Sequence, residues 1–174
     1  MQRSGPIVFT GFMGCGKSVV AREIASQLGL TMVDLDDAIT EIQGKSPARL
    51  IAEDGESAFR KIETAILERI LRDRSVGVIA LGGGAWITAA NRELIGQQGG
   101  LSVWLDTPFS VCWERIETSA EERPLGSSQQ QARELFERRR PVYQLAEISI
   151  TPAADDRLES IVERVKEEIA QHSH

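Results

Sequence analysis

The chain has 174 residues, of which 41% are hydrophobic and 26% are charged, and its formal net charge at pH 7 is −6. This length suits a single domain over residues 1–174, since chains divide only beyond ~250 residues, and the composition excludes a largely disordered protein. No apolar run approaches the ~20 residues of a membrane span. No secretory signal is expected, because the first residues lack a long apolar segment. The acidic balance argues against a general nucleic-acid or anionic-membrane binder.

The first half of the chain alternates expected strands with expected helices. Strands are predicted where short β-branched or aromatic runs occur, at Ile7–Thr10, Thr31–Val33 and Val76–Leu81. Helices are predicted between start and stop signals, at Gly16–Leu28, Ala38–Gln43, Ser46–Asp54 and Glu56–Asp73. The apolar face of the first helix is expected to consist of Val19, Val20, Ile24 and Leu28.

The second half continues this alternation. Strands are predicted at Leu101–Leu105 and Ile148–Thr151. Helices are predicted at Thr88–Ile95, from a Thr107-Pro108 cap to Glu117, from Gln129 to a stop at Pro141, and after a cap at Asp155 or Asp156. Glu121–Ser128 is expected to be irregular, and residues 171–174 are expected to fray. Five alternations of strand and helix predict a parallel sheet covered on both faces, in which ligands bind beyond the carboxyl ends of the strands.

The segment Gly11-Phe12-Met13-Gly14-Cys15-Gly16-Lys17-Ser18 matches G-x-x-x-x-G-K-[ST] at every fixed position, between an expected strand and an expected helix. Its glycines let backbone N–H groups converge on phosphate, Lys17 supplies a positive charge, and the Ser18 hydroxyl is a Mg²⁺ ligand. The alternative is a glycine-rich turn that only packs a strand onto a helix. The motif therefore predicts nucleoside triphosphate binding, but it does not identify the reaction in which the triphosphate is used.

Cysteine and histidine are scarce in this chain. Cys15 and Cys112 cannot build a disulfide framework and fit no zinc motif, which indicates a reducing cytoplasm. Cys15 is expected to be a small residue that faces away from ligand; the alternative is a thiol made acidic by the helix terminus. The two histidines both lie in the last three residues, so histidine acid–base catalysis is not expected.

Asp34 and Asp36 follow the second predicted strand. If this segment is extended, alternation places both carboxylates on one face. One could then orient the water shell of a metal ion while the other reaches an acceptor hydroxyl, as phosphoryl transfer requires. The alternative is a solvated acidic turn or a helix cap formed by Asp37.

Arginines occur at several predicted strand and helix ends. Arg60 and Glu63 share a helix face, either as a surface ion pair or as part of a site. At least one member of Arg138-Arg139-Arg140 is expected to be solvated. Arg123 lies in the irregular segment, where it could close over phosphates, and Arg115 could stack on a base or be solvated. Because arginine binds carboxylate bidentately, these residues predict a small anionic acceptor that carries a hydroxyl.

With these residues in place, the chain resembles the shikimate kinase family from Ile7 to about Ile169. The resemblance rests on several short motifs: Gly11–Ser18, Asp34-Leu35-Asp36, Asp54-Gly55-Glu56, Phe59-Arg60-Lys61-Ile62-Glu63, Gly82-Gly83-Gly84, Arg123-Pro124-Leu125 and Arg139-Arg140-Pro141-Val142-Tyr143. It implies an α/β fold of the three-layer P-loop kinase type. The sheet would have five parallel strands in the order 2-3-1-4-5, flanked by helices, with a substrate-binding region near 34–63 and a mobile lid near 114–128.

The resemblance also implies the reaction and its residues. The γ-phosphoryl group of ATP would pass to the 3-hydroxyl of shikimate with Mg²⁺, as one step of aromatic amino acid biosynthesis. Residues implied to bind ATP are Gly14, Cys15, Gly16, Lys17, Ser18, Val19, Arg115 and Arg123. Residues implied to bind shikimate are Asp36, Arg60, Glu63, Gly82, Gly83, Gly84 and Arg139. Lys17, Asp36 and Arg123 would be catalytic, and the metal would contact Ser18 directly and Asp34 through water.

Two departures from the family pattern are visible. The lid motif reads Arg123-Pro124-Leu125-Gly126 where the family has a second leucine, and the adenine loop near Pro152–Asp156 carries no arginine before Arg157. Adenine contacts there are therefore expected through the backbone.

Three other functions fit the sequence less well. A gluconate or nucleotide kinase is disfavoured by the Asp34/Asp36 pair and the Phe59-Arg60 segment. A regulatory module that has lost catalysis is disfavoured because the lysine, the metal ligand and the acceptor residues are all present. A GTP switch is disfavoured because no Asn-Lys-x-Asp segment occurs. The expected partner is a small molecule, not nucleic acid or a membrane, and the chain is expected to be a monomer because no long exposed apolar stripe demands a dimer.

Overall fold

The computed structural model describes residues 5–119 and 128–172. Its centre is a parallel five-stranded sheet in the order β2-β3-β1-β4-β5, which confirms the predicted order. The strands are β1 (Ile7–Thr10), β2 (Thr31–Asp34), β3 (Val76–Ala80), β4 (Leu101–Leu105) and β5 (Ile148–Ile150). The α-helices are α1 (Lys17–Leu28), α2 (Leu35–Gln43), α3 (Pro47–Asp54), α4 (Glu56–Arg72), α5 (Ala89–Gln97), α6 (Phe109–Thr118), α7 (Gln129–Tyr143) and α8 (Leu158–Gln171), and a 3-10 turn, η1, spans Ala85–Ile87.

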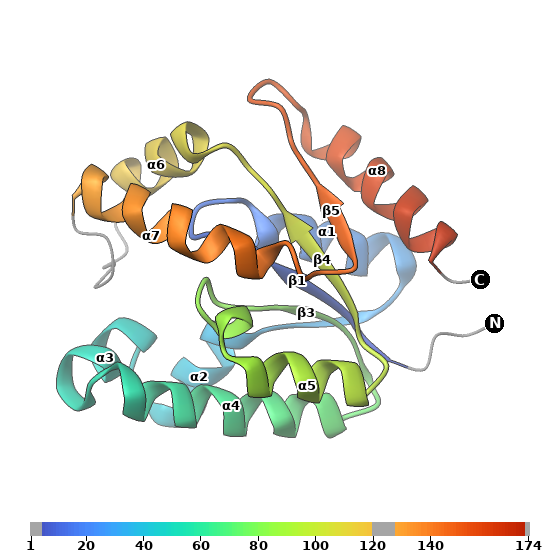
Figure 1. The fold of residues 1–174 in the computed structure, drawn as a ribbon. Helices are drawn as coiled ribbons and strands as arrows, with labels where there is room; N and C mark the ends of the chain where they lie inside the picture. The colour runs from blue at the N-terminus through green and yellow to red at the C-terminus, as the bar shows by residue number, and fades with distance from the viewer. Residues whose placement is uncertain (1–4, 120–127, 173–174) are drawn as a thin grey trace.

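Helices cover both faces of the sheet, as the alternation predicts. Figure 1 shows α1 and α8 on one side and α2, α4 and α5 on the other, with α3 at one end of the molecule and α6 and α7 above it. β1 and β4 are buried along their whole length, in keeping with their mostly apolar sequences. Within the described ranges, no helix is both long enough and apolar enough to span a membrane.

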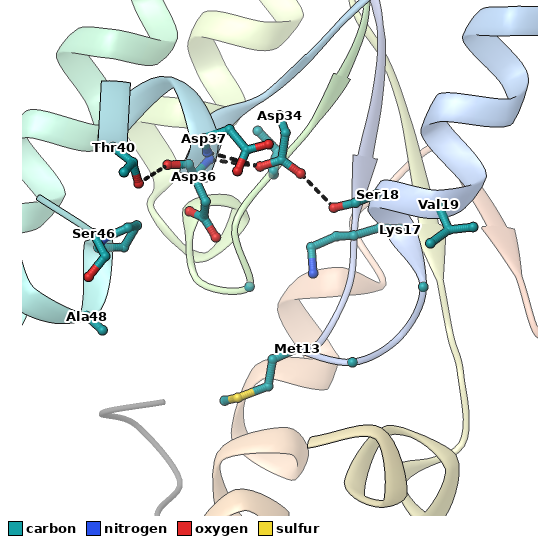
Figure 2. Close-up of a pocket in the computed structure, with 15 residues that line it drawn as sticks. Met13, Lys17, Ser18, Val19, Asp34, Asp36, Asp37, Thr40, Ser46 and Ala48 are labelled. Carbon is teal, nitrogen blue, oxygen red and sulfur yellow. Dashed lines mark hydrogen bonds between the residues drawn. The ribbon is translucent and has the colours of Figure 1, made fainter. Parts of the chain in front are cut away.

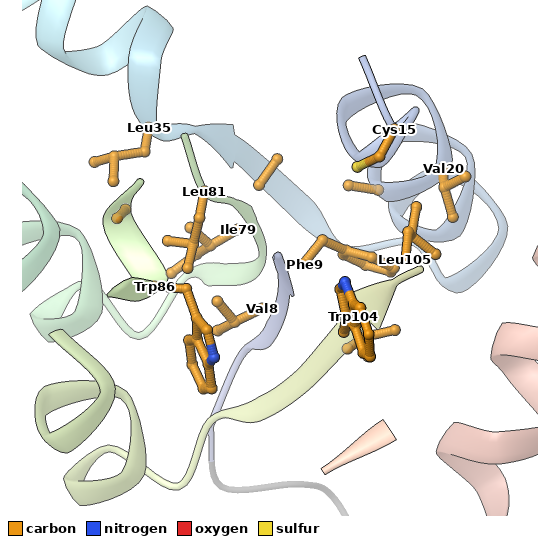
Figure 3. Close-up of a cluster of buried hydrophobic side chains, with 14 of the residues drawn as sticks. Val8, Phe9, Cys15, Val20, Leu35, Ile79, Leu81, Trp86, Trp104 and Leu105 are labelled. Atoms are coloured by element: carbon orange, nitrogen blue, oxygen red, sulfur yellow. The ribbon is translucent and has the colours of Figure 1, made fainter. Parts of the chain in front are cut away.

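The hydrophobic core lies between the sheet and its helices. Figure 3 shows its central part, where Phe9 of β1 lies among side chains from the neighbouring strands and from α1. The prediction for the apolar face of α1 was wrong at two positions, because Val19 is 50% exposed and Leu28 is 43% exposed. Ala21 and Ala25 are buried in their place, beside Val20 and Ile24.

Several predicted helix ends were wrong for local reasons. α2 begins at Leu35 rather than Ala38, because the Asp34 side chain accepts hydrogen bonds from the first N–H groups of the helix. α7 continues through Pro141 to Tyr143, and α8 has Arg157 rather than an aspartate at its N-cap. The Asp156 carboxylate instead accepts a hydrogen bond from the Ala153 N–H. The Thr107 hydroxyl, predicted to cap α6, donates to the Cys15 carbonyl.

Candidate active site

The segment between β1 and α1, residues 11–18, forms a tight loop that we call the phosphate loop. Gly14 and Gly16 have positive φ angles of 75° and 94°, a backbone conformation that other residues rarely adopt. A Cβ atom on Gly14 would lie 2.7 Å from the carbonyl oxygen of Cys112, so the loop also packs too closely against α6 for a side chain. The loop ends at the N-terminus of α1, where free N–H groups and the helix dipole favour an anion.

Lys17 and Ser18 place a cation and a hydroxyl beside this loop. The Lys17 side chain is nearly buried, and its Nζ donates to the Phe12 carbonyl at 3.3 Å. The Ser18 hydroxyl donates to Asp34 Oδ2 at 2.6 Å, and Figure 2 shows this bond at the edge of the cavity. The phosphate loop and the end of β2 are therefore joined through one serine–aspartate contact.

The two aspartates do not lie on one extended face, so that prediction was wrong. Asp34 is the N-cap of α2, and its Oδ1 accepts from the N–H groups of Asp36 and Asp37 at 3.0 and 3.3 Å. Asp36 therefore lies in the first turn of the helix. Both nevertheless line the same cavity as Lys17, a space of about 630 Å³. Figure 2 shows the Asp36 carboxylate directed into that space, on the opposite side from the Lys17 amine.

The glycine triplet, residues 82–84, brings three of the predicted site residues together. A Cβ atom on Gly82 would lie 2.6 Å from Asp36 Oδ1, and one on Gly84 would lie 2.1 Å from Arg60 Nη2. A Cβ atom on Gly83 would lie 3.5 Å from Arg139 Nη1. Each glycine thus leaves room for a different polar side chain, and the three side chains converge on one turn.

Arg60 and Glu63 form a buried pair rather than a surface pair. The Arg60 Nη1 atom donates to Glu63 Oε1 at 2.7 Å, and the Glu63 side chain is only 1% exposed. Burial raises the pKa of Glu63 above its usual value, although the charge and hydrogen bond of Arg60 act in the opposite direction. Burial also acts to lower the pKa of Arg60, but the charge and hydrogen bond of Glu63 outweigh it and raise that pKa. The pair is therefore held in a fixed place.

Arg139 is the buried member of the arginine run on α7, at 7% exposure, whereas Arg138 is exposed. Arg60, Arg138, Arg139 and Gly84 line a second cavity of about 320 Å³. Gly83 lines the larger cavity and Gly84 the smaller one, so the glycine triplet stands between them. A carboxylate that entered beside this turn would meet the two buried or half-buried guanidinium groups of Arg60 and Arg139.

A third cavity, of about 300 Å³, lies on the other side of the phosphate loop. It is lined by Val19 and Arg115 and by residues that come after β4 and β5, including Pro152 and Ala153. The exposed Arg115 side chain donates to the Gly14 carbonyl at 3.1 Å. Val19 is exposed because it faces these cavities rather than the core. The cavity has the apolar wall and the neighbouring arginine that a flat aromatic base requires.

The two cysteines and Arg123 are the remaining residues singled out from the sequence. Cys15 is buried, at 3% exposure, in keeping with a small structural residue. Burial raises the pKa of the neighbouring Cys112 thiol to about 12. Arg123 and most of the lid predicted for 114–128 lie outside the described residues. In the part of the chain that is described, no three histidine, cysteine or acidic side chains come together as a protein-only metal cage.

Comparison with known proteins identifies the family and the fold. The family model for shikimate kinase matches residues 13–170. The shikimate kinase of Rhizobium meliloti (strain 1021) is 36% identical over 169 residues, covering 95% of this chain and 86% of that protein. The solved structure of shikimate kinase from Acinetobacter baumannii in complex with shikimate superposes with a TM-score of 0.87 at 31% identity, over 97% of this chain and 94% of that one. A gluconokinase from Sinorhizobium meliloti 1021, at 22% identity and a TM-score of 0.66, shares the fold.

Proposed function

The chain belongs to the shikimate kinase family, and we propose that it transfers the γ-phosphoryl group of ATP to the 3-hydroxyl of shikimate. The observation that carries this proposal is the convergence of Asp36, Arg60 and Arg139 on the glycine triplet, beside a cavity that also holds Lys17. A hydroxyl-bearing carboxylic acid matches this set of groups, because the arginines match its carboxylate and the aspartate its hydroxyl.

The phosphate loop is proposed to hold the triphosphate. Backbone N–H groups of residues 14–19 would bind the phosphate oxygens, and Lys17 would leave the Phe12 carbonyl to contact the outer phosphates. The base would occupy the third cavity, between Arg115 and the loop that begins at Pro152.

A magnesium ion fits the oxygen donors beside the loop. The Ser18 hydroxyl and the Asp34 carboxylate lie 2.6 Å apart, and Mg²⁺ prefers oxygen ligands and keeps several waters. Ser18 would hold the ion directly and Asp34 through water. When bound, the ion would neutralise charge on the phosphate oxygens.

The acceptor would lie between the glycine triplet and α2. Arg60 and Arg139 would bind its carboxylate, and Glu63 would keep Arg60 in place. The Asp36 carboxylate would orient the reacting hydroxyl and take its proton while the oxygen attacks the γ-phosphorus. The bond from that phosphorus to the bridging oxygen breaks and ADP leaves. Because the transition state is loose, catalysis depends mainly on positioning and charge neutralisation, and Arg123 is proposed to contribute to the latter.

A coupled ADP-release assay tests the proposal. The purified protein is supplied with ATP and Mg²⁺, and shikimate, quinate, gluconate and a nucleoside monophosphate are offered in turn. We expect rapid ADP release with shikimate and little release with the other acceptors or with none. Equal rates with gluconate or a nucleotide, or fast hydrolysis of ATP without any acceptor, would contradict the proposal.

A further inference from the structure

We infer that Tyr143 is a positioning residue for the acceptor site, because its buried hydroxyl ties the turn at Gly83 to the helix that carries Arg139. The inference deepens the proposed function and rests on it. Tyr143 is the last residue of α7 and is 1% exposed. Its hydroxyl donates a short hydrogen bond to the carbonyl oxygen of Gly83, which lies 60 positions earlier in the chain.

The hydrogen bond fixes the peptide plane between Gly83 and Gly84. The described chain contains no cis peptide bond, so the N–H of Gly84 points away from the carbonyl of Gly83 and therefore away from Tyr143. Glycine restrains its own backbone less than any other residue, and three glycines stand in a row here. The Ala85 N–H already donates to the Gly82 carbonyl across this turn, and the Tyr143 hydroxyl adds a hydrogen bond from outside that holds the Gly83 carbonyl.

The helix that carries Tyr143 also carries Arg139. Arg139 lies four residues before Tyr143 on α7, which places the two side chains on one face of the helix. Burial raises the pKa of Tyr143, while the positive charge of Arg139 acts to lower it. The Nη1 atom of Arg139 also lies 3.5 Å from the position of a Cβ atom on Gly83. The phenol therefore joins the turn at Gly83 to the helix that carries Arg139.

Packing keeps the phenol ring in place. The ring stacks on Trp104 of β4, with centroids 6.2 Å apart and an interplanar angle of 26°. A second hydrogen bond joins the same two segments, because Trp86 Nε1 donates to the Val142 carbonyl at 3.0 Å. That bond fastens η1 to the end of α7 without touching Gly83 or Arg139. It provides a control that separates positioning of the acceptor site from general attachment of α7.

The first test compares Tyr143→Phe with Trp86→Phe in steady-state kinetics. Removing the hydroxyl deletes one buried hydrogen bond and keeps the ring, so we expect the KM for shikimate to rise about tenfold in Tyr143→Phe. We expect its kcat and its KM for ATP to change less than about twofold, since the phosphate loop is not touched. Trp86→Phe is expected to lower thermal stability without this rise in KM. An unchanged KM for shikimate in Tyr143→Phe, or an equal rise in both variants, would overturn the inference.

The second test labels Tyr143 instead of replacing it. It therefore does not require a substituted protein to fold. Tyr143 is the sole tyrosine of the chain, and 3-fluorotyrosine supplied during expression therefore labels this position alone. We expect the ¹⁹F resonance of the labelled protein to shift when shikimate is added and to move little with ADP alone. A ¹⁹F chemical shift that stays unchanged at a saturating concentration of shikimate would also overturn the inference.

A measurement without acceptor separates this inference from the proposed function. If the unaltered protein released no ADP with shikimate, the proposed function would fail. Amide hydrogen exchange at Gly84 would still report on the turn, and we expect it to accelerate in Tyr143→Phe and not in Trp86→Phe. Equal exchange in both variants would show that the hydroxyl does not order the turn.

Discussion

Replacing Gly84 by alanine should separate Arg60 from the acceptor without disturbing ATP binding. Gly84 has φ −106° and ψ −8°, angles that alanine adopts without strain. The new Cβ atom would lie 2.1 Å from Arg60 Nη2 and 2.7 Å from its Cζ, distances that real contacts do not reach. The guanidinium must therefore move. Because it is held by Glu63 at 2.7 Å and by Glu56 at 3.3 Å, it cannot move without weakening those contacts.

The size of the effect depends on the contacts that the displaced arginine loses. A hydrogen bond to a charged group contributes about 1.5–3 kcal/mol, and the Glu63 carboxylate that would lose it is almost fully buried. We therefore expect the free energy of unfolding to fall by about that amount. A loss of the same size at the acceptor carboxylate corresponds to a rise of roughly 10- to 150-fold in its KM, at ~1.4 kcal/mol per tenfold change.

Gly96→Ala is the matched control. Gly96 lies within α5, and an added Cβ atom there would meet nothing within 4 Å. Alanine is favoured over glycine inside a helix, so this variant should gain up to about 1 kcal/mol of stability and keep its kinetics. The assay varies shikimate and ATP separately in both proteins and measures urea unfolding in parallel. If Gly84→Ala kept the acceptor KM of the unaltered protein, the assignment of Arg60 to the acceptor would be refuted.

The same geometry leads to three further expected outcomes. Asp36→Asn should keep the affinity for ATP and lose most of kcat, as measured by nucleotide titration and ADP release; near-normal turnover would remove Asp36 from its catalytic role. Ser18→Ala deletes the hydroxyl that faces Asp34 Oδ2. We therefore expect the Mg²⁺ concentration needed for half-maximal rate to rise about tenfold, with no change in the KM for shikimate. An unchanged metal requirement would contradict the assignment of Ser18 as a magnesium ligand. Burial raises the pKa of Glu63, so its proton stabilises the folded state below the unfolded pKa, near 4.5, and that contribution is lost as pH rises through the folded pKa. Urea unfolding from pH 4 to 8 should therefore show the stability of Glu63→Gln relative to the unaltered protein increasing with pH, and parallel curves would count against the raised pKa.

Sequence periodicity and turn signals located every strand of this fold to within about one residue at each end, but they did not supply the strand order. That order came from the likeness to a family, because period-2 and period-3.6 patterns describe one element at a time. The phosphate loop was found from sequence alone because all of its chemistry lies within eight consecutive residues.

Some of the errors involve contact with residues far away in the sequence, whereas the early start of α2 reflects its own N-cap, Asp34. Pro141 predicts a helix stop, yet α7 continues to Tyr143, and its last two residues bind the segment after β3 through the Val142 carbonyl and the Tyr143 hydroxyl. Val19 has the spacing of a core residue but faces a cavity, and periodicity does not distinguish a core from a ligand site. Tyr143 belongs to the quoted motif Arg139–Tyr143, but no role was assigned to it, because its partner is a backbone carbonyl that a sequence pattern does not identify.

The strand order itself arranges the three cavities. β1 is the central strand, so the phosphate loop at its carboxyl end lies between the loops after β2 and β3 on one side and those after β4 and β5 on the other. The first pair of loops carries Asp36 and the glycine triplet, and the second pair carries the lining of the third cavity. A triphosphate bound after β1 would thus extend its γ-phosphoryl end toward the acceptor groups and its base toward Pro152. If β1 were an edge strand, the phosphate loop would have neighbouring loops on one side only. The acceptor and the base would then have to bind on that same side of the triphosphate.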